Sequence, residues 1–101
     1  MKIFISQLMN SLTKKQILKD RDFITKKIKE EIGDKFEVIN SYVDTSPPDH
    51  VKNRSVWFLA ESISFLAQAD VAVFGPGWEN GRGTVLENKI AKDYGIKTIE
   101  L

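Results

Sequence analysis

Residues 75–87, GPGWENGRGTVLE, hold the side chains of this 101-residue chain that are best suited to chemistry. The stretch contains four glycines, and the last two of them flank Arg82. A glycine-rich loop that leads into a helix leaves backbone N–H groups free at the helix start, where anions bind. Glu87 lies one turn inside the expected helix, so its carboxylate would face whatever occupies the loop. This pattern predicts a site in which Glu87 is a nucleophile or general base at a sugar-sized pocket.

Glu87 also has a structural interpretation. Thr84 and Glu87 have the spacing of a capping box, and a glutamate in the first helical turn interacts favourably with the helix dipole. Spacing alone favours this capping role, and the two roles are compatible. Arg82 has two interpretations as well, because it could pair with a phosphate or carboxylate or remain a solvated surface side chain.

Other polar and aromatic residues near this loop are candidates for ligand contacts. Gly75, Pro76 and Gly77 could form a turn with positive φ, because their spacing is not that of a dinucleotide-binding fingerprint. Trp78 lies in a polar stretch where no periodicity requires burial, so it could stack on a base. Ser6, Gln7 and Asn10 follow the first expected strand, and could bind a ligand or satisfy backbone groups of their own loop.

Composition narrows the classes of function. The length indicates a single domain over residues 1–101, and a net charge of +1 gives no support for binding a nucleic acid polymer. The absence of cysteine excludes disulfides, thiolate zinc sites and thiol catalysis. With one histidine, His50, we expect no metal site and no cofactor. The N-terminal MKIFISQ lacks the apolar core of a signal peptide, and no apolar run suits a membrane span, so we expect a cytoplasmic protein without a membrane partner.

Strands and helices are expected to alternate along the chain. Four apolar runs predict strands, at Lys2–Ile5, Phe36–Ile39, Val71–Phe74 and Ile96–Ile99. This alternation favours a small, doubly wound α/β domain with a four-stranded parallel sheet in the order 2-1-3-4. Ligands bind such sheets beyond the carboxyl ends of the strands, at the point where the winding reverses. That point lies between the loops at 6–11 and 75–82, the two loops that composition already singles out.

Three helices are predicted between the strands. The first is capped by Thr13 and Gln16, ends at Gly33, and buries a stripe made of Ile17, Arg21, Ile24, Ile28 and Ile32. The second spans Arg54–Gln68, with its core face expected along Trp57, Ala60, Ile63 and Ala67. The third spans Thr84–Tyr94. Prolines and acidic residues predict an irregular loop over Asn40–Asn53.

The residues just described resemble those of the nucleoside 2-deoxyribosyltransferase-like superfamily, in particular a small branch found in bacteria and their phages. The likeness covers nearly the whole chain, from Ile3 through the 6–10 loop, the Ser41-Tyr42 pair and the Pro47-Pro48 loop, and it includes Trp57 and Ser62. It is best from Ala69 to Glu87, where Gly83, Thr84 and Glu87 match the family's Gly-Thr-x-x-Glu element. The resemblance implies a Rossmann-like fold and a Glu87 carboxylate that attacks an anomeric carbon.

The same resemblance implies that the partner is a small-molecule nucleoside or nucleotide, and that the chain forms a homo-oligomer with its site near the subunit interface. The ligand-binding residues would be Ser6, Gln7, Met9, Asn10, Tyr42, Asp70, Gly75, Pro76, Gly77, Trp78, Asn80, Arg82, Gly83 and Thr84. The leading hypothesis is therefore an N-glycosidase or deoxyribosyltransferase. Two others stay open: a protein that captures a nucleotide or an ADP-ribose-type signal without cleaving it, and a partner-binding domain with no ligand.

Overall fold

The centre of the molecule is a four-stranded, all-parallel sheet in the predicted order β2-β1-β3-β4. The computed structural model describes residues 1–8, 12–41, 43 and 45–101. The strands are β1 (Lys2–Ser6), β2 (Glu37–Val38), β3 (Val71–Phe74) and β4 (Lys97–Glu100). β3 has the predicted bounds, because its uniformly apolar run suits a strand buried on both faces. β2 is shorter than predicted, because only two of its residues pair with β1 at the sheet edge.

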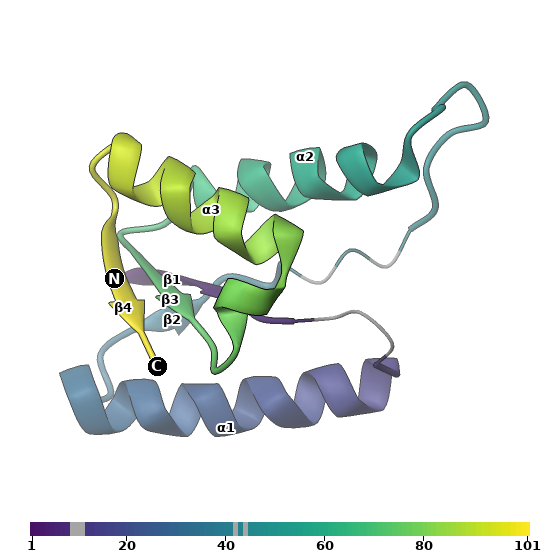
Figure 1. Ribbon diagram of the computed structural model, residues 1–101. Helices are drawn as coiled ribbons and strands as arrows, with labels where there is room; N and C mark the ends of the chain where they lie inside the picture. Colours follow the sequence, from purple (N-terminus) through teal and green to yellow (C-terminus); the bar gives the residue numbers. More distant parts are fainter. Residues whose placement is uncertain (9–11, 42, 44) are drawn as a thin grey trace.

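Helices cover both faces of the sheet, which makes the domain doubly wound (Figure 1). They are α1 (Lys14–Ile32), α2 (Arg54–Leu66) and α3 (Arg82–Asp93), and a short 3₁₀ helix, η1 (Trp78–Asn80), precedes α3. α1 lies under one face, and α2 and α3 lie side by side over the other. None of the helices in the described parts of the chain has the length and apolar character needed to cross a lipid bilayer.

The predicted ends of α1 are confirmed. Thr13 and Gln16 form both hydrogen bonds of a capping box, and Gly33 ends the helix with φ at 85°. A positive φ of this kind is easily adopted only by glycine, which explains why the helix stops there. Four of the five residues of the predicted stripe are buried, namely Ile17, Arg21, Ile24 and Ile28, and the fifth, Ile32, is half-buried against the same core.

The core consists of two apolar layers, one on each side of the sheet. Ile3 and Ile5 of β1 pack toward α1, whereas Phe4 packs toward α2 and α3. This division follows from the alternation of side chains along a strand. Ser6 is next in the alternation after Ile5, so it shares the side of Phe4 and faces α2 and α3.

The predicted core face of α2 is wrong in part. Trp57 and Ile63 are half-buried, but Ala60 and Ala67 are exposed, and the fully buried residue of α2 is Leu66. The face that turns inward carries Leu59, Ser62 and Leu66, which recur at helical spacing. A hydrophobic pattern treats serine as a solvent-facing residue. When part of the inward face of a helix lines a polar pocket, the pattern therefore assigns the wrong face of the helix to the core.

Candidate functional site

The loops that follow β1 and β3 meet at the carboxyl end of the sheet, as the topology predicts. Ser6 and Phe74 are paired at the ends of the two strands, and the Gly75 N–H donates to the Ser6 carbonyl at 2.8 Å. Leu8 of the first loop packs against the second so closely that a Cβ on Gly81 would lie 2.6 Å from Leu8 Cδ2. The two segments therefore form one structural unit at the winding reversal.

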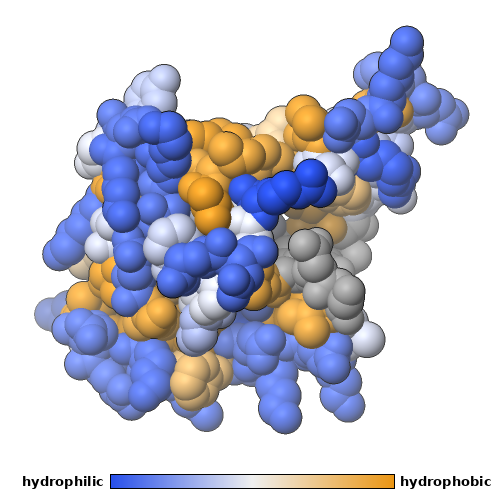
Figure 2. Space-filling model, in the orientation of Figure 1, coloured by the Kyte–Doolittle hydropathy of each residue, from blue (hydrophilic) through white to orange (hydrophobic). Residues whose placement is uncertain are grey.

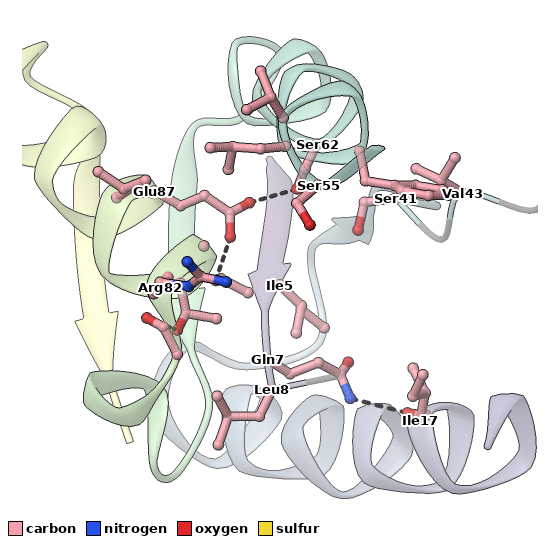
Figure 3. A pocket seen from close by; sticks show the side chains of 18 of the residues that line it. Ile5, Gln7, Leu8, Ile17, Ser41, Val43, Ser55, Ser62, Arg82 and Glu87 are labelled. Carbon is pink, nitrogen blue, oxygen red and sulfur yellow. Dashed lines mark hydrogen bonds between the residues drawn. The ribbon is translucent and has the colours of Figure 1, made fainter. Parts of the chain in front are cut away.

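A pocket of about 730 Å³ opens beside this unit, between the sheet end, α2 and the start of α3 (Figure 3). It is lined by Ile5, Ser6, Gln7, Leu8, Ile17, Ser41, Val43, Asn53, Ser55, Val56, Phe58, Leu59, Ser62, Gly81, Arg82, Gly83, Thr84, Leu86 and Glu87. Val56 and Leu86 among them are 59% and 45% exposed, and apolar surface is visible between α3 and α2 in Figure 2. The volume is in the range of small-molecule sites.

Glu87 carries the only carboxylate among the described residues that line this pocket. It comes from α3 and is 5% exposed. Ser6 Oγ of β1 donates to its Oε1 at 3.0 Å, and Ser62 Oγ of α2 donates to its Oε2. Figure 3 shows the carboxylate pointing from α3 toward the pocket, with Ser62 above it. Three elements that are distant in sequence thus converge on a single acidic group.

Burial sets the protonation behaviour of this carboxylate. Removal from water raises the pKa of Glu87 above its ordinary value of 4.5, while the hydrogen bonds from Ser62 and Ser6 act in the opposite direction. The net direction is upward, so the hydroxyls compensate only in part for the lost hydration. A carboxylate with a raised pKa in a cleft is typical of functional sites.

The capping interpretation of Glu87 is wrong. α3 begins at Arg82 rather than at Thr84, with Gly81 as its N-cap and no side-chain cap. Thr84 Oγ1 instead donates to the carbonyls of Trp78 and Gly81, which fastens η1 to the helix start. Glu87 is therefore the sixth residue of α3, beyond the first turn, where it has no free backbone N–H to accept from.

Six of the predicted site residues line the pocket together. They are Ser6, Gln7, Arg82, Gly83, Thr84 and Glu87. Gln7 has its amide committed to α1, because its Nε2 donates to the Ile17 carbonyl at 3.0 Å and its Oε1 accepts from Arg21 Nε at 3.0 Å. Arg82 is exposed and its guanidinium lies near the pocket in Figure 3. The start of α3, with backbone groups free of a side-chain cap, lies on the same side.

The structure places the other predicted contacts elsewhere. The Trp78 ring packs against Phe74, with 5.6 Å between ring centroids, and belongs to the core layer under α2 and α3. Asp70 lies at the amino end of β3, where its Oδ2 accepts from the Lys2 N–H at 2.7 Å, so the length of β3 separates it from the pocket.

The turn after β3 is also directed away from the pocket. Gly75 and Pro76 line a smaller cavity of about 340 Å³ on the α1 side, with Gln7 and Leu8. Gly77 has φ at 80° and acts as the N-cap of η1, as a turn with positive φ requires, and Asn80 is an exposed residue of η1. Met9, Asn10 and Tyr42 lie outside the described residues.

Sequence reasoning missed most of the wall that α2 supplies. Asn53, Ser55, Phe58 and Leu59 line the pocket, and Ser62, which entered only through the family resemblance, contacts Glu87 directly. A signal for this wall was present, because Ser55 and Ser62 are seven residues apart in α2 and share one face. Ser41, which is 4% exposed, closes the same side of the pocket.

Comparisons with protein-family models, with curated proteins and with solved structures found no match to this chain. Within the described ranges, no three acidic or histidine side chains lie close enough together to hold a metal ion.

Proposed function

We propose that the protein acts on the N-glycosidic bond of a nucleoside or nucleotide, as a hydrolase or a deoxyribosyltransferase, with Glu87 as the nucleophile. The observation that carries this proposal is a buried carboxylate, held by two serine hydroxyls, in an open pocket at the winding reversal of the sheet. The resemblance of residues 69–87 to the nucleoside 2-deoxyribosyltransferase-like superfamily supports the same assignment.

The reaction makes direct use of such a carboxylate. One Glu87 oxygen bonds to the anomeric carbon while the carbon–nitrogen bond breaks, and the base leaves with the bonding electron pair and takes a proton from water. Negative charge beside the sugar stabilises the oxocarbenium-like transition state. Water then cleaves the glycosyl ester in a hydrolase, and the nitrogen of a second base attacks it in a transferase.

The pocket walls suit the two ends of such a ligand. Phe58 and Leu59 of α2 offer apolar surface for a base, while the serines near Glu87 offer hydroxyls for a sugar. If the ligand is a nucleotide, the uncapped N-terminus of α3 and Arg82 are positioned for a phosphate.

The test is release of free base from a panel of nucleosides and 5′-monophosphates, followed by chromatography. Glu87→Gln keeps the shape of the side chain but removes the nucleophilic charge, so turnover should be lost while calorimetry still detects ligand binding. Glu79→Gln is the matched control, because Glu79 is exposed on η1 and does not line the pocket. Unchanged turnover in Glu87→Gln would refute the nucleophile assignment.

A second proposal is capture of a nucleotide or an ADP-ribose-type signal without cleavage. It is favoured by one feature of the described lining residues, which hold one carboxylate and no histidine, so no second acid is at hand to protonate a departing base. The protein is incubated with each ligand, denatured, and the released material analysed. Intact ligand in stoichiometric amount favours capture, whereas free base favours catalysis.

We also propose that the protein is a homo-oligomer with its pocket near the subunit interface. The exposed apolar side chains at the pocket mouth, Val56 and Leu86, support this arrangement. Sedimentation over a range of concentrations tests it, and a monomer throughout that range would contradict it.

A further inference from the structure

We infer that Ser62 of α2 is a positioning residue, which fixes the orientation of the Glu87 carboxylate and keeps it competent to attack. The inference deepens the proposed function and rests on it. It starts from one contact, the hydrogen bond from Ser62 Oγ to Glu87 Oε2, which joins α2 to α3 across the pocket wall (Figure 3).

The two serines restrain the carboxylate from different elements. Ser6 is the last residue of β1 and is 2% exposed, so its hydroxyl holds Oε1 from the rigid end of the sheet. Ser62 holds Oε2 from α2, one helical turn before Leu66, the residue that fixes α2 to the core. With both oxygens held, rotation about the last bond of Glu87 is blocked. With one hydroxyl removed, the carboxylate can turn about the other.

The same contact favours the charged form of Glu87 inside a poorly hydrated site. Attack on an anomeric carbon requires the ionised carboxylate, and a hydroxyl that donates to it stabilises that form. After attack, one oxygen belongs to the ester and the other is its carbonyl, so one of the two hydroxyls can keep donating throughout. Ser62 therefore acts on the reacting group through Glu87 and should affect kcat more than KM.

The experiment compares three variants of α2 by steady-state kinetics over a range of pH. Ser62→Ala removes the donor, and kcat should fall about tenfold, the scale of a hydrogen bond to a charged group. The acid limb of its pH–rate profile should move to higher pH. Ser62→Thr keeps a hydroxyl and should retain the native acid limb. Ser64→Ala is the matched control, because Ser64 is exposed on the same helix, donates to the Glu61 carbonyl and does not line the pocket.

A second measurement separates this inference from the proposed function. The titration of the Glu87 carboxyl is followed by carbon-13 NMR on glutamate-labelled protein, with the resonance assigned by its loss in Glu87→Gln. A higher midpoint in Ser62→Ala but not in Ser64→Ala supports the positioning role, even if no substrate is turned over. An unchanged midpoint in Ser62→Ala, or a kcat equal to that of the native chain where turnover is found, overturns it.

Discussion

Two pocket-lining glycines, Gly81 at the N-cap of α3 and Gly83 in its first turn, should respond to the same substitution in opposite directions. At Gly81 an added Cβ would lie 2.6 Å from Leu8 Cδ2 and 2.6 Å from Thr84 Oγ1. The backbone there is extended, with φ at −106°, so alanine meets crowding rather than backbone strain. At Gly83 the nearest atom is Leu59 Cδ1 at 3.9 Å, an ordinary contact, and the residue lies within α3.

The expected magnitudes follow from these distances. Gly81→Ala forces Leu8 or the Thr84 hydroxyl to move, and crowding of this kind costs about 1–3 kcal/mol. Gly83→Ala restricts the unfolded chain at a position where the backbone is helical and no clash results, so it should raise the free energy of unfolding by about 0.4–1 kcal/mol. Urea unfolding at constant pH measures the change in the free energy of unfolding for both variants. An unchanged slope m would show that the substitutions do not alter the compactness of the denatured state.

The same pair separates stability from ligand binding. Because Gly83 lines the pocket, the methyl group of Gly83→Ala takes space next to a bound ligand. We expect Gly83→Ala to unfold at a higher urea concentration than the native chain, and calorimetry should show that it binds nucleotide more weakly. The reasoning is refuted if Gly81→Ala is as stable as the native chain, or if Gly83→Ala is destabilised.

Three further predictions concern the charged group, the core and the link to α1. Burial raises the pKa of Glu87, so the free energy of unfolding should fall as the pH rises from 4.5, the ordinary pKa, through the raised pKa of the folded state. Glu87→Gln removes this charge and should therefore resist urea better than the native chain at pH 8 but not at pH 4. Leu66→Ala should lower the free energy of unfolding by about 2–5 kcal/mol in denaturant titrations, because Leu66 is 1% exposed. Gln7→Ala should cost about 3 kcal/mol in thermal unfolding, because it leaves the charged and buried Arg21 Nε without its hydrogen-bond partner.

The sequence was sufficient for the topology and for the end of the sheet at which the pocket lies. Short apolar runs predict the buried strands of a parallel sheet. Because the strands alternate with helices and the crossovers are right-handed, few strand orders are possible. Glu87 could be placed in the site because the loop before α3 must lie at the carboxyl end of β3. That inference needs only chain order and the right-handed crossover, which are properties of the backbone.

Contacts between distant segments could not be read in the same way. The spacing of Thr84 and Glu87 fits a capping box, but α3 starts two residues earlier, and the Thr84 hydroxyl donates to the carbonyls of Trp78 and Gly81 instead. Trp78 looked free in a polar loop, yet it covers Phe74. In each case a contact with another element decides the outcome, and local pattern carries no information about it.

Glu87 occupies a position at which burial in the fold favours a neutral side chain. Glu87 lies on the inner side of α3, near the buried Asn88 and Ala91, where an apolar or neutral residue would avoid the loss of hydration. It caps no helix, and the raised pKa shows that the two serine hydroxyls do not fully offset its burial. Stability alone therefore gives no reason for a carboxylate there, whereas the proposed reaction, which develops positive charge on a sugar, does.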